Sequence, residues 1–303
     1  MSYKIGSFNC LNLGMGASKD TRKFADIIIN EGFDIIALQE IKGPLALKRI
    51  QTLLPPYWKG AADIECGVND YAFLWNSRRF DLANADESGI SRVYQPRIYK
   101  QYKIDRKAGQ TDLIREPYYA RFFPVGGAAP YIEIRLINTH IRFTKGSDPE
   151  PNTPGAVGMR RNEFDILTRA IYAKEADKRY GNNRPAYTIL LGDYNLNLPS
   201  SKATSPYLIE SFQIEDGRSS KIITTVQHDL TTLSKADNNT DNDNNTFSNN
   251  YDHFTFDING FSDVVVSCNR VNTVEKYCEN NQEIHIKDIS DHVPIKMDFA
   301  IRR

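Results

Sequence analysis

The sequence contains little cysteine, carries no net charge and has no long apolar run, and each absence narrows what the protein can be. Its four cysteines do not show the paired spacing of a zinc site, so we expect reduced thiols and a cytoplasmic location. A Cys268–Cys278 bridge would instead fit a secreted protein whose leader had been removed. No stretch approaches the ~20 apolar residues that span a bilayer, and the first residues lack the apolar run of a signal peptide.

Charge and motif content exclude further classes. Lys plus Arg and Asp plus Glu both total 38, so a polyanionic partner would have to be bound by a local excess of positive charge. The chain has neither a C-x5-R phosphatase loop nor a Walker lysine motif, which argues against cysteine-based phosphatase chemistry and nucleoside-triphosphate hydrolysis.

Short β-type runs alternate with helical patterns along the whole chain, with no internal repeat and no Pro-rich linker. Strands are predicted at residues 4–11, 34–39, 71–75, 132–136, 187–191 and 293–301, and helices at residues 21–30 and 162–176. In the first helix Phe24, Ile27 and Ile28 share one face, and Ser18 or Asp20 can cap its start. This order predicts one α/β domain over residues 1–303, a sandwich of two sheets with flanking helices.

Two segments depart from this pattern. Residues 92–121 hold eight Lys or Arg against three acidic residues, with five tyrosines among them. Basic residues interleaved with aromatic rings suit a nucleic-acid backbone with bases to stack on, so we expect DNA contacts from Arg97, Lys100, Lys103 and Lys107, with a solvated surface loop as the alternative.

Residues 234–250 are rich in Asn and Asp and nearly free of apolar side chains, which predicts a mobile loop outside the core.

Polar side chains gather where the predicted strands end, the position where α/β proteins collect catalytic groups. They are Asn9, Glu40, His140, Asp193, Asn195, Asp252, Asp291 and His292. Taken singly, Asn9 could cap a turn and Asp193 could bond its own backbone after Gly192. Together they suit phosphodiester hydrolysis, because carboxylates bind a hard divalent cation and a histidine backed by a carboxylate can accept a proton from water.

The same residues carry a family resemblance. In order, FNCLNL, ALQEIK, YAFLW, REPYYARF, INTHIRF, RRNEFDIL, LLGDYNLN, NNYDHFTF and ISDHVPI resemble the motifs of the endonuclease/exonuclease/phosphatase superfamily, in its deoxyribonuclease I-like branch. The resemblance runs from about residue 4 to the last strand. It implies a four-layered α/β sandwich, with two mixed β-sheets packed face to face and helices outside.

The resemblance also implies roles for individual residues. Mg²⁺, or alternatively Mn²⁺ or Ca²⁺, would be bound by Glu40 with Asn9 and Asp291 near it. Asp252 and His292 would orient or deprotonate the attacking water.

On the phosphate side, the resemblance implies that His140 contacts the scissile phosphate and acts as general acid. Asp193 and Asn195 would hold the phosphate, the water or a second metal, and Arg115 would grip the phosphate. One position departs from the family pattern: where an acidic partner of His140 is expected just before the YAFLW strand, the nearest candidates are Asn69 and Asp70, and the best-aligned one is Asn69.

The choice of substrate follows from a few segments. The histidine in INTH, the Arg115-Glu116-Pro117 block and the Tyr251-Asp252 pair are closest to the deoxyribonuclease I branch. We therefore expect an endonuclease that cleaves DNA by in-line attack of an activated water. The alternatives are another phosphoesterase (sphingomyelinase-like, or a phosphoinositide or nucleotide phosphatase) and a catalytically silent binding module. Buried or solvated structural positions are expected for Tyr71, His228, His253 and His285.

Overall fold

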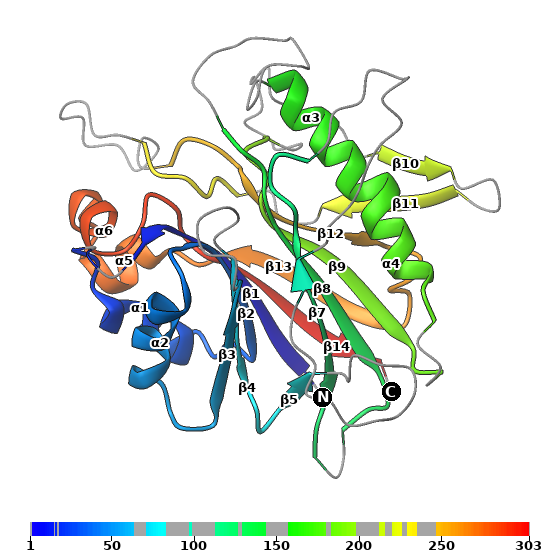
Figure 1. Cartoon of the computed structure of the whole chain (residues 1–303), viewed down its shortest axis with the longest axis horizontal. Coiled ribbons are helices and arrows are strands. Elements are labelled where there is room, and N and C mark those ends of the chain that lie inside the picture. Colours follow the sequence, from blue (N-terminus) through cyan, green and yellow to red (C-terminus); the bar gives the residue numbers. More distant parts are fainter. Residues whose placement is uncertain are drawn as a thin grey trace.

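The structure is a computed structural model. It describes residues 2–14, 16, 18–63, 71–82, 97–98, 113–126, 129–143, 157–179, 183–197, 212–215, 220–225, 229–234 and 247–302. Figure 1 shows two twisted sheets that overlap in this view, with helices outside them, and buried side chains of both sheets form one cluster between them.

Sheet A has six strands in the order β13-β14-β1-β2-β4-β3. Their bounds are β1 (Ser2–Leu13), β2 (Ile35–Ile41), β3 (Trp58–Ala62), β4 (Ala72–Asn76), β13 (Val264–Arg270) and β14 (Ile295–Ile301). β1 runs parallel to β2 and antiparallel to β14, so both ends of the chain meet in the centre of this sheet. Helices α1 (Thr21–Asn30) and α2 (Pro44–Leu53) follow β1 and β2, and α5 (Thr273–Cys278) and α6 (Gln282–Asp288) lie between β13 and β14.

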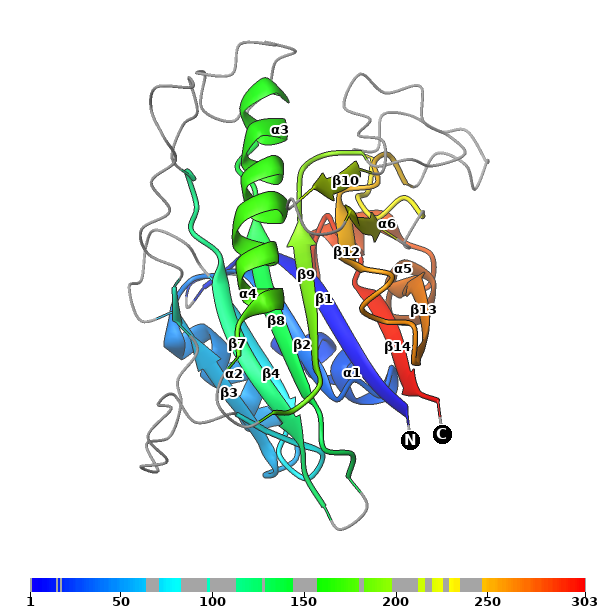
Figure 2. The ribbon, with the colours of Figure 1, turned by 90° about the vertical axis from the view of Figure 1, so that its right-hand side faces the viewer.

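Sheet B has eight strands on the path β10-β11-β12-β9-β8-β7-β5, and β6 pairs with β7 beside that path. The bounds are β5 (Phe80–Leu82), β6 (Arg97–Ile98), β7 (Tyr118–Pro124), β8 (Glu133–His140), β9 (Ala186–Asp193), β10 (Phe212–Glu215), β11 (Ser220–Thr225) and β12 (Asp252–Asp257). Between β8 and β9 the chain forms α3 (Val157–Ile166), the π-helical turn Leu167–Tyr172 and α4 (Ala173–Asp177). In Figure 2 this helical column stands along the outside of sheet B.

Three apolar clusters hold the layers together. The largest lies between the sheets and combines Phe73 of sheet A with Leu136 and Phe254 of sheet B. A second packs α1 and α2 on the outer face of sheet A, and a third packs the α3–α4 column on the outer face of sheet B. Successive residues of β8 point to opposite faces of sheet B. Leu136 packs in the central cluster and Ile137 packs in the cluster on the outer face. The expected four-layered sandwich of two mixed sheets is confirmed.

Most predicted elements lie where the sequence indicated. The first helix spans Thr21–Asn30, its Phe24, Ile27 and Ile28 are buried, and the Asp20 side chain caps it by accepting from the Arg22 backbone N–H. The second predicted helix starts earlier than expected, at Val157. Strand β4 starts one residue late, and Tyr71 just before it is fully buried.

The end of the Asn/Asp-rich segment 234–250 corrects an expectation. Residues 235–246 lie outside the described residues, but residues 247–250 pack against the body of the protein. The Asn250 side chain is 0% exposed and its backbone N–H donates to Asn197 Oδ1 at 2.7 Å, while the Arg270 guanidinium lies 3.9 Å from the centre of the Phe247 ring. Composition failed here because hydrogen bonds, together with the packing of Phe247 against Leu233, Val274 and Val293, fix this stretch.

Two further expectations can be compared with the described residues. Cys268 and Cys278 are free thiols, so the alternative disulfide is not formed. No helix among the described ranges is long and apolar enough to cross a membrane.

Candidate active site

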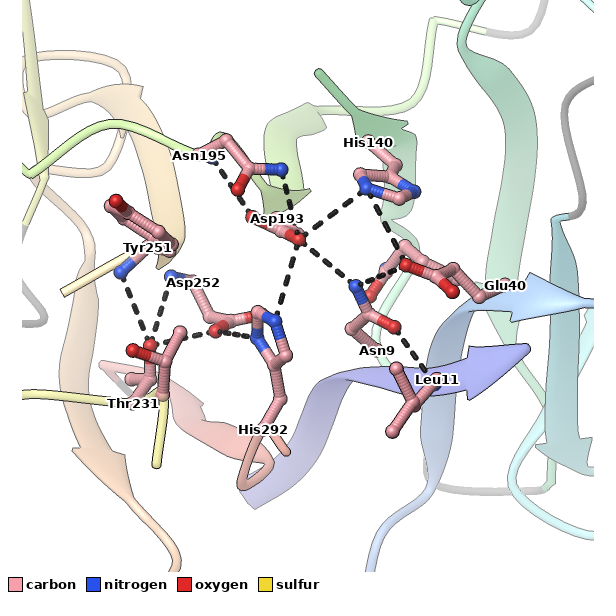
Figure 3. Close-up of polar contacts among 12 residues, drawn as sticks. Asn9, Leu11, Glu40, His140, Asp193, Asn195, Thr231, Tyr251, Asp252 and His292 are labelled. Atoms are coloured by element: carbon pink, nitrogen blue, oxygen red, sulfur yellow. Dashed lines mark hydrogen bonds and ion pairs between the residues drawn. The ribbon is translucent and has the colours of Figure 1, made fainter. Parts of the chain in front are cut away.

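Strand register brings the polar residues of sheet B together at one edge. β8 pairs in parallel with β9, which sets His140 opposite Asp193, and β12 pairs antiparallel with β9, which sets Asp252 opposite the same aspartate. Gly192 makes this approach possible: it has φ +140°, and a Cβ there would lie 1.9 Å from the Thr139 carbonyl oxygen. Figure 3 shows Asp193 at the centre of the resulting cluster.

His292, from the turn before β14, joins this cluster from sheet A. Its Nδ1 lies 2.8 Å from Asp252 Oδ2 and its Nε2 lies 3.7 Å from Asp193 Oδ2. The Thr231 hydroxyl donates to the same Asp252 oxygen at 2.6 Å, so the carboxylate is fixed from two sides (Figure 3). Because a carboxylate can only accept, Nδ1 of His292 carries the proton and Nε2 faces Asp193.

Burial and charge oppose each other in this cluster. Burial alone would lower the pKa of His292, but the nearby Asp252 and Asp193 carboxylates outweigh it and raise that pKa well above its usual value. Burial raises the pKa of Asp193, which is 1% exposed. His292 and Asp193 therefore influence each other's proton binding.

Sheet A contributes Asn9 and Glu40 from the ends of β1 and β2. The Asn9 amide nitrogen donates to Glu40 Oε1 at 3.1 Å and to Asp193 Oδ2 at 2.9 Å, which ties the two sheets together (Figure 3). Its oxygen accepts from the Leu11 backbone N–H at 3.0 Å, so Asn9 also caps a turn, the simpler of the two sequence interpretations. Glu40 has φ +59°, a left-handed conformation that is uncommon outside glycine and is often found at functional sites.

The donor set on this side fits a hard divalent cation. Glu40 is a partly exposed carboxylate, and Asp291 Oδ1 is a buried oxygen with no hydrogen-bond partner among the described residues. Oxygen ligands of this kind are those that Mg²⁺, Mn²⁺ and Ca²⁺ bind. Asn9 turns its nitrogen toward Glu40, so it acts as a donor that orients the carboxylate. One ligand atom each from Asp193, Asp252 and His292 lie within 4.8 Å of one another and form a second group that could hold an ion.

His140 lies between the two halves of the site. An Arg115 Nη1 lies 2.6 Å from its Nδ1 and 2.8 Å from its Nε2, and Nε2 is 3.7 Å from Glu40 and 3.5 Å from Asp193. Burial, followed by the Arg115 charge, lowers the pKa of His140 well below its usual value. A neutral imidazole can donate one hydrogen bond, and the expected role of His140 as general acid stays a prediction.

The partner of His140 differs from the family pattern. Asn69, the aligned position, lies outside the described residues. In the described part of the chain the carboxylates paired with His140 are those of Glu40 and Asp193, and its backbone N–H donates to the Tyr71 hydroxyl at 2.9 Å. Tyr71 is thus a buried support, in agreement with its expected structural position.

Asn195 lies next to Asp193 in the same cluster. Its amide nitrogen donates to the Ile141 carbonyl at 2.8 Å and to Asp193 Oδ2 at 3.2 Å, and its backbone N–H donates to Asp193 Oδ1 at 2.9 Å. Asp193 therefore does bond its own backbone after Gly192, while its other oxygen faces the cluster. The backbone interpretation therefore describes one oxygen of Asp193, and the functional role of this residue stays a prediction.

The basic segment is described only in part. Arg97 lies in β6, whose backbone pairs with β7 opposite Tyr119. Lys100, Lys103 and Lys107 lie outside the described residues. Two histidines expected to be structural are buried away from the cluster: His253 Nε2 lies 2.8 Å from the Asn250 carbonyl, and His285 Nδ1 lies 2.6 Å from the Ser290 carbonyl. His228 lies outside the described residues.

Several residues of the site were not singled out from the sequence. Thr231 lies in a segment without a recognisable motif, so only the fold reveals that it holds Asp252. Glu163 and Arg160 belong to the RRNEFDIL block, which was quoted for the resemblance but not assigned a role. Both are buried, at 1% and 0% exposure, close to the elements that carry Arg115 and Asn195.

Comparisons with known proteins identify the family. Residues 6–292 match the model of the endonuclease/exonuclease/phosphatase family. The chain belongs to this family. Its members are phosphoester hydrolases that depend on a divalent metal ion, which agrees with the oxygen-rich donor set. A search of curated proteins found no match to the sequence.

Solved structures of the family share the fold. TDP2 of D. rerio in complex with a single-strand DNA product has a TM-score of 0.58 at 13% identity, covering 98% of both chains. A family member from Bacteroides thetaiotaomicron has a TM-score of 0.55 at 14% identity, covering 100% of this chain and 99% of that one. A mannosyl-6-phosphatase from the same organism has a TM-score of 0.56 at 14% identity, covering 99% and 100%.

Proposed function

We propose that the protein is a divalent-metal-dependent phosphodiesterase that cleaves DNA as an endonuclease. The observation that carries the proposal is the buried Asp252–His292 pair, joined through Asp193 to Asn9 and Glu40 at a single edge of the two sheets. A proton acceptor, a cation site and several phosphate-binding donors are the parts that in-line hydrolysis of a phosphodiester needs.

His292 is the proton acceptor in this proposal. Its Nε2 takes a proton from water as the water oxygen bonds to phosphorus, and Asp252 holds Nδ1 and stabilises the imidazolium that forms. The bond from phosphorus to the leaving oxygen breaks on the opposite side, and that oxygen takes up a proton from solvent to become a hydroxyl. A divalent ion held by Glu40 and Asp291 would supply positive charge that stabilises the phosphate oxygens and opposes early protonation of His292.

His140, Asn195 and Arg115 bind the phosphate in this proposal. Neutral His140 offers one N–H, Asn195 an amide and Arg115 a guanidinium, and these donors can stabilise the negative charge that builds on the phosphate oxygens. Asp193 orients two of these donors, since its carboxylate bonds Asn195 and lies 3.5 Å from His140, and it also accepts from Asn9.

An exposed aromatic ring near the site is compatible with a nucleic-acid substrate. Phe143, three residues after His140, is 41% exposed, and its ring centre lies 6.4 Å from that of Tyr251 and 4.7 Å from the Arg160 guanidinium. A ring fixed in this way beside the phosphate donors can stack on a base, which contributes about 1–3 kcal/mol per base in single-strand binding. The basic composition of residues 92–121 and the DNA product bound by the D. rerio relative support the same choice.

The second candidate is a phosphomonoesterase acting on a sugar phosphate. The similarity of the fold to the mannosyl-6-phosphatase supports it, with a TM-score close to that of the DNA-bound relative. An exposed aromatic ring can also pack on a sugar, so the ring alone does not separate the two candidates.

One experiment distinguishes them. Supercoiled plasmid is incubated with Mg²⁺, with and without EDTA, beside matched assays on bis-p-nitrophenyl phosphate and p-nitrophenyl phosphate. We expect nicked plasmid and diester cleavage that EDTA abolishes, and neither in His292→Ala. An intact plasmid together with rapid monoester hydrolysis would refute the nuclease and leave the monoesterase.

A further inference from the structure

Glu163 is a buried acid that the proposed chemistry does not use. It lies on α3, its side chain is 1% exposed, and its Oε1 accepts from the Ile114 backbone N–H at 2.8 Å. Burying a carboxyl group is unfavourable unless its hydrogen bonds compensate. A leucine at this position of α3 would fill the same space without the cost of burying a polar group. The presence of an acid therefore indicates that its hydrogen bond has a specific role.

The partner segment leads directly to the phosphate side of the site. Ile114 precedes Arg115, whose Nη1 lies 2.6 and 2.8 Å from the two ring nitrogens of His140. Residues 113–117 lie before β7, so ladder hydrogen bonds of sheet B do not fix their backbone. The Glu163 side chain therefore supplies a fixed point one residue away from Arg115.

We propose that Glu163 is a positioning residue that holds the Ile114–Arg115 backbone, so that the Arg115 guanidinium stays beside His140 and meets the substrate phosphate. A contact made by a side chain this long needs an anchored backbone, because an Arg already loses rotamer entropy when its guanidinium is held in place. The phosphate contact of Arg115 rests on the proposed function, whereas the anchoring of Arg115 by Glu163 does not.

Charge supports this arrangement. Burial raises the pKa of Glu163 to about 7, against the lowering effects of the Ile114 N–H and of the Arg115 and Arg142 charges. Both the protonated and the ionised Glu163 carboxyl have an oxygen that can accept from the Ile114 N–H. This hydrogen bond therefore persists above and below neutral pH. A neutral amide in its place should therefore retain most of the function.

Three variants test the proposal. Glu163→Met has a similar length and no acceptor, and we expect kcat/KM for the diester to fall about 10-fold to 100-fold, as when an outer residue that orients a functional side chain is lost. Glu163→Gln keeps an acceptor and should recover most of this loss. Asp165→Asn removes an exposed acid from the same helix and should match the wild type, since its side chain is 44% exposed and pairs with Arg169.

A double-mutant cycle shows whether Glu163 acts through Arg115. Arg115→Met combined with Glu163→Met should be little worse than Arg115→Met alone, because the anchor has nothing left to position. Additive losses, or a Glu163→Gln variant as poor as Glu163→Met, would overturn the proposal by showing a general structural role. The melting temperature of every variant is measured. If Glu163→Met does not fold, Glu163→Ser replaces it, because serine leaves room for a water molecule at the Ile114 N–H.

Binding of inorganic phosphate, followed by calorimetry in the presence of Mg²⁺, separates this inference from the proposed function. We expect Glu163→Met to weaken phosphate binding while Asp165→Asn does not. A wild type that binds phosphate but hydrolyses no diester contradicts the proposed function. Phosphate affinity unchanged in Glu163→Met contradicts the anchoring of Arg115, whatever the substrate proves to be.

Discussion

Lowering the pH should destabilise the turn that carries His292, because the buried neutral imidazole of His285 makes a hydrogen bond to this turn. His285 on α6 is 0% exposed, its Nδ1 lies 2.6 Å from the Ser290 carbonyl and its Nε2 lies 2.7 Å from Thr273 Oγ1. A carbonyl can only accept, so Nδ1 carries the proton and Nε2 accepts from the threonine. Ser290 in turn accepts from the His292 backbone N–H and donates to the Asn9 carbonyl.

The magnitude follows from the pKa of His285. Burial lowers it from 6.5 to about 4, assisted by the charges of Lys19 and Lys23. Between these two values the unfolded chain binds the proton and the folded chain does not, so the free energy of unfolding decreases as the pH falls. This contribution is fully present above pH 6.5 and is lost progressively toward pH 4. At about 1.36 kcal/mol per pKa unit, the full loss is about 3 kcal/mol.

Urea unfolding of the wild type and of His285→Asn, near pH 7 and near pH 4.5, measures this loss. Asparagine keeps an N–H near the position of Nδ1 and does not titrate. The variant should be less stable than the wild type near neutral pH, and the difference should shrink by about 2–3 kcal/mol at the lower pH. A difference that stays constant with pH would refute the reasoning, because it would mean that His285 is not held neutral by burial.

Three further outcomes are expected. Glu40→Gln should abolish Mg²⁺-dependent turnover with an unchanged circular dichroism spectrum, and full activity under limiting Mg²⁺ would remove Glu40 from the metal site. Asp252→Asn and His292→Ala should each lower kcat by about 10²–10⁴-fold. The double variant should be little worse than the poorer single variant, because the two residues share one task. Strictly additive losses would show that the two residues act separately. Removing the charges of Arg97, Lys100, Lys103 and Lys107 should weaken DNA binding and flatten its salt dependence, by about 0.9 in the log–log slope per lost phosphate contact, and an unchanged slope would assign these residues to a solvated surface.

Local sequence determined the elements of this fold because their signals are short-range. The alternation of Ile134 and Leu136 in β8, and the shared face of Phe24, Ile27 and Ile28 in α1, are set by backbone periodicity, and both match the structure. The strand-end positions of Glu40, His140 and Asp193 are equally local. The family resemblance added the four-layer arrangement, which periodicity does not contain.

Local composition misled where distant residues supply the contacts. The stretch 247–250 was expected to be a mobile loop from its polarity, yet Asn249 and Asn250 are bonded to Thr231, Thr232 and Asn197. Hydrogen bonds to backbone do not require apolar residues, so a composition rule based on core packing cannot detect them. The role of Thr231 beneath Asp252 was missed for the same reason.

The sequence by itself therefore determined which chemical groups the protein has and the strand ends at which they lie. Only the tertiary structure decided how they act, since that depends on burial and on contacts between residues far apart in the chain. Asn9 and Asp193 are 184 positions apart, and their 2.9 Å hydrogen bond joins the two sheets. His140 and His292 are the same residue type, but burial together with Arg115 lowers the pKa of the first, whereas the Asp252 and Asp193 carboxylates raise the pKa of the second despite its burial. Electrostatic interactions are set by distance and dielectric in space, and a linear sequence encodes neither.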